Sequence, residues 1–187
     1  MTHTGSEIRE ALAALHAESV RYWQEFDSAS FLAPIGDAWS PAGNVRHLTK
    51  AMRAVTKGLQ LPRIFLLLAF FAPRRPSRSF DGMRDVYRAR LAEGASAGPF
   101  APGPRVTTTD PGSERAQIMT DHAVAVEALS RAIAAWPEPL LDRRHLPHPL
   151  LGKLTVREML FFTLYHNQHH VDTVRRRVRA ASTSARP

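Results

Sequence analysis

The apolar positions of the chain fall into four long stretches with helical spacing. They run from about Ser6 to Phe26, from Pro41 to about Gln60, from Ser113 to about Trp136, and from Thr155 to about Arg179. In each stretch apolar residues recur every three or four positions, which places them on one face of a helix. This pattern predicts an all-α protein, an up-down four-helix bundle with the helices packed up-down-up-down.

Three of these stretches begin with residues that favour a helix start. Ser40 is a preferred N-cap, and Pro41 fits the first helical position because a backbone donor is not needed there. Ser113 is a suitable N-cap for the third helix. Thr155, followed three residues later by Glu158, predicts a capping box for the fourth.

A long insertion, about residues 59–112, separates the second and third helices. It begins with the uncharged run Ile64–Ala72, whose nine residues fall short of the roughly 20 that span a bilayer. A short helix is predicted over 82–91, and residues 92–112 are rich in Gly, Ala and Pro and should be irregular. We expect the insertion to cover one end of the bundle and residues 61–78 to wall the substrate pocket; core packing or a dimer contact are the alternatives for this segment.

Composition sets limits on the class of protein. A chain of 187 residues with 44% hydrophobic residues suits one domain, 1–187, with residues 180–187 as a frayed tail. The absence of cysteine excludes disulfides and thiolate ligands, so a transition-metal site would use nitrogen and oxygen donors. The N-terminus has no signal-peptide pattern, and a cytoplasmic protein is expected.

The formal net charge is +8, and much of it is local. Arg74, Arg75 and Arg78 cluster in the insertion, while the arginines over 175–179 close the last helix, where cations favour the helix dipole. The charge permits an anionic partner. Nucleic acid is an unexpected partner, because no recognition motif or interleaved aromatic set accompanies the basic residues.

The strongest chemical signal is a pair of histidines in the fourth predicted helix. His166 and His170 are four residues apart, so their imidazoles lie on one helical face and can converge on one divalent ion. A third ligand is needed, and the best candidate is His47, whose helix face carries small residues such as Gly43 and Ala51. The alternative is that all three are ordinary histidines of the core or surface.

The other histidines are predicted to have no ligand role. His122 and its neighbour Asp121 should form a solvated pair, and His145 and His148 should be turn and surface residues. His169 cannot easily join His166 and His170 on one ion, because adjacent side chains on a helix diverge.

Three segments together resemble the DinB/YfiT-like metalloprotein superfamily. They are Trp39-Ser40-Pro41-Ala42 with the following His47-Leu48, then His148 to Thr155, then Tyr165-His166-Asn167-Gln168-His169-His170. The resemblance covers nearly the whole chain and implies an up-down four-helix bundle. It also implies a divalent metal, zinc, nickel or iron, held by His47, His166 and His170.

Characterised members of this superfamily include thiol S-transferases and thiol-dependent isomerases. The resemblance therefore implies a metal-dependent transferase that activates a low-molecular-weight thiol for attack on an electrophilic small molecule. In this interpretation Arg74, Arg75 or Arg78 would hold carboxylates of the thiol.

Two other interpretations stay open. In a metal-dependent hydrolase a bound hydroxide would be the nucleophile, but the general base expected next to the first histidine is missing, since position 167 is Asn. The third possibility is a non-catalytic stress-response or binding protein with a structural or vestigial metal. A homodimer is compatible with all three.

Overall fold

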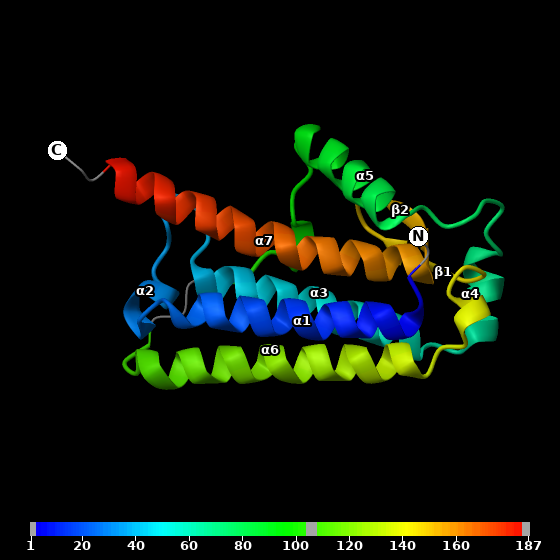
Figure 1. The fold of residues 1–187 in the computed structure, drawn as a ribbon, viewed down its shortest axis with the longest axis horizontal. Coiled ribbons are helices and arrows are strands. Elements are labelled where there is room, and N and C mark those ends of the chain that lie inside the picture. The colour runs from blue at the N-terminus through cyan, green and yellow to red at the C-terminus, as the bar shows by residue number, and fades with distance from the viewer. Residues whose placement is uncertain (1–2, 104–107, 185–187) are drawn as a thin grey trace.

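A bundle of four long helices dominates the computed structural model, which describes residues 3–103 and 108–184 (Figure 1). The four helices are α1 (Gly5–Gln24), α3 (Pro41–Gln60), α6 (Pro111–Ala134) and α7 (Val156–Ser184). Each lies close to its predicted range, and the all-α four-helix bundle is confirmed. None of the described helices is both long enough and apolar enough to cross a membrane.

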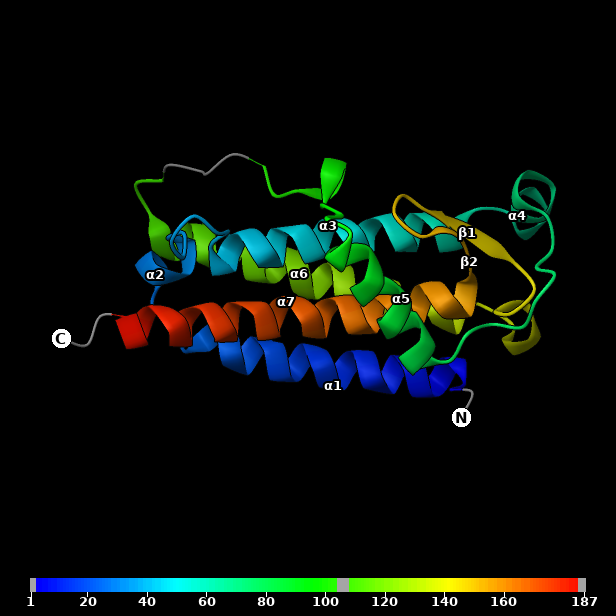
Figure 2. The same cartoon turned by 90° about the horizontal axis from the view of Figure 1, so that it is seen from above.

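The directions of the helices differ from the predicted alternation. Thr49 of α3 contacts His122 of α6, and ten residues further along α3, Leu59 contacts Trp136 just beyond α6. The contacts advance in the same direction along the two helices, so α3 and α6 are parallel, as Figures 1 and 2 also show. The order is up-down-down-up, because the long insertion carries the chain back along the bundle before α6 begins.

The insertion forms helices of its own. They are α4 (Arg63–Phe70), α5 (Phe80–Ala92) and the 3-10 turn η1 (Gly98–Phe100). Helix α4 lies at one end of the bundle, as predicted for the insertion, whereas α5 packs along α7 (Figure 2). The segment predicted to be irregular over 92–112 contains η1 and the start of α6; its residues 104–107 lie outside the described part.

Short elements complete the fold. They are α2 (Ser28–Leu32), η2 (Glu138–Leu140), and the antiparallel strands β1 (His145–His148) and β2 (Gly152–Thr155). The hairpin was not predicted, because its eight residues show no clear alternation of apolar and polar positions. It packs against α4 and α7, with Leu146 and Leu154 buried in the main core.

The predicted caps are confirmed at α3 and α7. The hydroxyl of Ser40 accepts a hydrogen bond from the Gly43 amide at 2.9 Å. Thr155 and Glu158 form both bonds of the capping box, at 2.9 and 3.1 Å. Asp110, rather than Ser113, caps α6.

The end of α7 differs from the prediction. The helix continues to Ser184, so the predicted frayed tail over 180–187 is helical through residue 184. Residues 185–187 of that tail lie outside the described part of the chain.

Candidate metal centre

Three histidines from two helices meet inside the bundle. His47 lies two turns into α3, and His166 and His170 lie one turn apart in the middle of α7. The Nε2 atom of His166 is 3.0 Å from Nε2 of His47 and 3.1 Å from Nε2 of His170. The structure thus brings together the three residues that the sequence singled out, and all three are buried.

The outer nitrogens of two of these rings have fixed partners. Nδ1 of His47 lies 2.8 Å from the carbonyl oxygen of Phe100, and Nδ1 of His170 lies 2.7 Å from Oδ1 of Asn44. The Asn44 amide group is oriented by donating from Nδ2 to the carbonyl oxygen of Ser40 at 2.9 Å. Both Nδ1 atoms therefore carry the proton and donate, which leaves the Nε2 atoms of His47 and His170 as lone pairs.

The third ring cannot satisfy both of these lone pairs. A single proton on Nε2 of His166 can be donated to only one of its two neighbours. Nδ1 of His166 is buried and has no hydrogen-bond partner within the described residues. Buried polar atoms are normally paired. Two of the three inward-facing Nε2 atoms are lone pairs and the third carries at most one proton, so hydrogen bonds alone leave one lone pair unpaired. The cluster therefore fits a bound cation better.

Burial also keeps these rings neutral. It lowers the pKa of His166 and of His170 well below the usual histidine value, and the neighbouring histidines lower both further. Burial lowers the pKa of His47 too, against the opposing effect of the bond to Phe100. Neutral imidazole is the form that ligates metals, so the ligand state persists at neutral pH.

Aromatic rings fix the orientation of the α7 pair. The ring of Phe162 stacks on His166 with centroids 5.0 Å apart, and the ring of Trp39 lies parallel to His170 at 6.1 Å. Trp39 immediately precedes the N-cap of α3, which explains how the Trp-Ser-Pro-Ala segment belongs to the site. These contacts hold the imidazoles in place before any ligand binds.

A cavity of about 290 Å³ opens beside the three histidines. Small residues of α3, including Ala51 and Gly58, form one wall, and Tyr87 and Leu91 of α5 form another. No Asp, Glu, Lys or Arg lines it in the described part of the chain. An apolar cavity that ends at a cluster of ligating groups is a typical small-molecule site.

A sequence model of the DinB superfamily matches residues 11–174, which is most of the chain. The chain belongs to the DinB superfamily. A solved structure titled "Crystal structure of TT2238, a four-helix bundle protein" matches it with a TM-score of 0.55 and 17% sequence identity, covering 92% of this chain and 98% of that one. At that identity the likeness shows the fold alone. No curated protein matches the chain.

Within this DinB bundle, His148 departs from its prediction as a surface residue. It lies in β1, lines the cavity, and packs edge-on against Phe162 with centroids 4.3 Å apart. Its Nδ1 accepts hydrogen bonds from the amides of Leu150 and Leu151, at 3.2 Å each. The ring proton is therefore on Nε2, and burial lowers the pKa of His148 to about 4.

His122 and Asp121 also differ from the predicted solvated pair. The side chain of Asp121 is 45% exposed and pairs with Arg53, whereas His122 is buried. Because the Thr49 hydroxyl donates to the carbonyl of Val45, it accepts from Nδ1 of His122 at 3.1 Å. The two side chains diverge, as neighbours on a helix do. His145 lies at the edge of the hairpin, where its Nδ1 is 3.1 Å from the carbonyl oxygen of Phe71.

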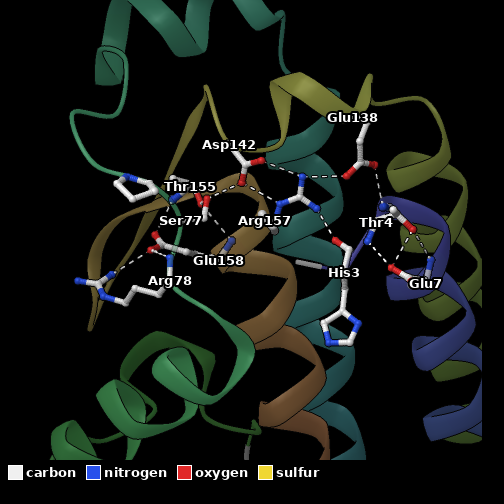
Figure 3. A network of polar contacts seen from close by, with 12 residues as sticks. His3, Thr4, Glu7, Ser77, Arg78, Glu138, Asp142, Thr155, Arg157 and Glu158 are labelled. Carbon is white, nitrogen blue, oxygen red and sulfur yellow. Dashed lines mark hydrogen bonds and ion pairs between the residues drawn. The ribbon is translucent and has the colours of Figure 1, made fainter. Parts of the chain in front are cut away.

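The arginines of the insertion are not part of the cavity. Arg75 and Arg78 bind the buried carboxylate of Glu158. This carboxylate also accepts from the Arg78 and Thr155 amides at 2.9 Å each, and Figure 3 shows Arg78, Thr155 and Glu158 together. Burial raises the pKa of Glu158, but these bonds outweigh it and hold the pKa below its usual value. The predicted contact of Arg75 and Arg78 with substrate carboxylates is therefore wrong; Arg74 is exposed and away from the cavity lining.

The polar network continues at the start of α7. Beside Glu158, Arg157 donates to Asp142 and Glu138 at 2.7 to 2.8 Å and also to the carbonyl of His3 (Figure 3). Arg157 thus ties the start of α7 to the N-terminus and to residues 138–142, while Glu158 ties it through Arg78 to the segment that leads into α5. From the insertion, the cavity wall takes residues of α5 and η1 and of the segment between them, with Leu61 and Phe70 from the predicted 61–78 segment, while the hairpin adds Leu146 and His148.

Two contributors to the site were not predicted from the sequence. Asn44, three residues before His47, orients His170, and the backbone carbonyl of Phe100 orients His47. Asn44 was visible as a polar residue on the small-residue face of its helix. Nothing in the sequence marks Phe100, because a backbone carbonyl carries no side-chain signal.

Proposed function

We propose that His47, His166 and His170 bind one divalent metal ion, and that the protein is a metal-dependent transferase joining a low-molecular-weight thiol to an apolar electrophile. The observation that carries this proposal is the convergence of three neutral imidazole nitrogens on one end of an uncharged cavity. Zinc, nickel and iron all suit three nitrogen donors.

Held by these three neutral imidazoles, such an ion would supply Lewis acidity, which lowers the pKa of a thiol toward neutrality. The reaction is balanced without another cofactor. The thiol loses its proton to solvent, its sulfur bonds to an electrophilic carbon, and the leaving group departs with the electrons of the broken bond.

The cavity walls favour an uncharged electrophile. Met159, Phe162 and Leu146 line the space beside the histidines with apolar surface, which favours apolar ligands over charged ones. His148 adds a hydrogen-bond donor to this wall, because its Nδ1 is occupied by backbone amides and its proton is on Nε2. An electrophile that combines an apolar body with one oxygen acceptor matches these features.

Hydrolysis is the weaker alternative. Activation of water normally uses a general base close to the metal. No carboxylate lines the cavity in the described residues, and the Nδ1 lone pair of His148 is already engaged by backbone amides. A non-catalytic binding protein would use the same metal and cavity without turnover.

The test is an assay of the metal-loaded protein with 1-chloro-2,4-dinitrobenzene and cysteine or glutathione. We expect thiol-dependent turnover in the wild type and its loss in His47→Ala. Ala51→Phe should keep the metal but fill the cavity, and it should lower turnover at least tenfold. Thiol-independent cleavage of p-nitrophenyl acetate would instead support a hydrolase, and no turnover with any thiol would favour the binding protein.

A further inference from the structure

Helix α4 exposes an unusual number of large apolar side chains. Six such side chains are exposed in the described part of the chain, and five lie on α4 or next to its ends. They are Leu61, Ile64, Phe65, Leu68 and Phe71. Leu68 and Phe71 are 70% and 68% exposed. The α4 face, as we call these five residues, is thus a contiguous apolar surface.

Packing inside the molecule does not account for this face. Leu66, on the opposite side of α4, is completely buried, and Phe70 lines the cavity. Helix α4 is therefore apolar on both sides although only one side meets the protein. A helix that is apolar all round is normally covered on all sides, and large exposed apolar patches mark interaction sites.

Positive charge surrounds the α4 face. Arg63 is the first residue of α4, and Arg74 follows the last residue of α4 by four positions. Arg144 donates to the carbonyl of Arg63 at the start of α4, and the ammonium group of Lys153 lies 5.3 Å from the Phe71 ring at its end. Arg63, Arg74 and Lys153 are all exposed. The apolar face consequently has a cationic rim.

We propose that the α4 face docks the protein on a membrane surface rich in anionic lipids. The apolar side chains would enter the boundary between headgroups and acyl chains, while the basic rim would contact anionic headgroups. At eight residues α4 is far too short to span the bilayer, so the contact is peripheral. Figures 1 and 2 show α4 at the end of the bundle, where a flat surface can reach it.

A second copy of the chain is a less suitable partner. A symmetric contact between two α4 faces would bring Arg63, Arg74 and Lys153 of each copy against the same residues of the other. In the described part of the chain, none of these three cations is paired with a carboxylate that would reduce this repulsion. An anionic membrane surface would attract these cations, so no such repulsion arises.

The position of α4 also connects the membrane contact to the cavity. Leu61 and Phe70, at the two ends of α4, line the cavity that reaches the histidines. This link rests on the proposed function: an apolar electrophile dissolved in the bilayer would enter the cavity beside the docking helix. The docking itself does not depend on a bound metal.

The experiment is co-sedimentation of the full-length protein with vesicles. Phosphatidylcholine vesicles are compared with vesicles containing 30% phosphatidylglycerol, at low and high salt. We expect at least tenfold tighter binding to the anionic vesicles, weakened by salt. Leu68→Ser combined with Ile64→Ser should reduce that binding at least tenfold, as should Arg74→Gln combined with Lys153→Gln. These side chains are exposed, so folding should be preserved.

The matched control is Val124→Ser, which removes a 52% exposed apolar side chain from α6. It should bind vesicles like the wild type. Absence of binding to anionic vesicles, or equal losses in Val124→Ser and the α4 variants, would overturn the proposal. So would a dimer in sedimentation velocity that Leu68→Ser dissociates, since the α4 face would then join two copies. Metal content, measured in parallel, keeps this result separate from the proposed function.

Discussion

The side-chain oxygen of Asn44 lies 2.7 Å from Nδ1 of His170, on a helix 126 residues away in the chain. This bond determines which nitrogen of His170 carries the proton, and so which one faces His47 and His166. Asn44 is not itself a candidate metal ligand, but it sets the protonation of His170, which is one.

Replacement of Asn44 tests this role. Asn44→Ala should weaken metal affinity by about 10- to 100-fold, because partners that orient ligating histidines typically contribute that much. Asn44→Asp, which keeps an oxygen acceptor, should retain most of the affinity. Isothermal titration with Zn²⁺ measures both, with circular dichroism to verify folding. Equal affinity in Asn44→Ala and the wild type would show that the bond is incidental.

The buried carboxylate of Glu158 should matter more for stability than its surface counterparts. Glu158→Gln removes the partner of Arg75 and Arg78, and we expect the free energy of unfolding to fall by about 2 kcal/mol. Glu127→Gln, which breaks an exposed pair with Arg131 on α6, is the control and should change it by less than about 0.5 kcal/mol. Urea denaturation measures both values. Similar losses in the two variants would contradict the anchoring role of Glu158.

The buried His122 predicts a pH dependence of stability. Burial lowers its pKa from 6.5 to about 4, so between these values the unfolded chain binds the proton and the folded chain does not. Stability from this residue is complete above pH 6.5 and is lost as the pH falls toward 4, by about 3 kcal/mol in all.

His122→Asn isolates this contribution. The variant keeps a donor for Thr49 but does not titrate, so its unfolding free energy should fall less than that of the wild type between pH 6.5 and 4. Urea denaturation with a chelator present, at several pH values, measures the difference. Parallel pH profiles for the two proteins would mean that His122 is protonated equally in both states.

Local patterns made much of this fold predictable. The apolar stripe of α3 and the Ser40 cap depend on residues a few positions apart, and both are found in the structure. The direction of α6 depended instead on the path of the 59–112 insertion, which no local pattern specifies. The sequence likewise revealed that Arg75 is charged but not that Glu158, 83 residues later, is its partner.

The candidate site likewise has a part that local sequence patterns predicted and a part that depends on tertiary structure. His166 and His170 were paired by helical spacing, and the small residues on its helix face made His47 the best third candidate, which the resemblance supported. His148 was misjudged because its place in the cavity wall comes from the hairpin, which the sequence did not reveal. Asp121 is half-exposed whereas its neighbour His122 is buried. Adjacent residues of a helix point in different directions, so the sequence neighbour of a side chain does not indicate its environment.

The central claim is that His47, His166 and His170 hold one divalent ion. The most direct measurement is the metal content of protein purified without an affinity tag or added metal, determined by inductively coupled plasma mass spectrometry. We expect about one ion per chain in the wild type and in the control His145→Ala, and severe loss in each of His47→Ala, His166→Ala and His170→Ala. Full occupancy in His47→Ala, or a wild type that takes up no divalent metal even when it is supplied, would contradict the claim.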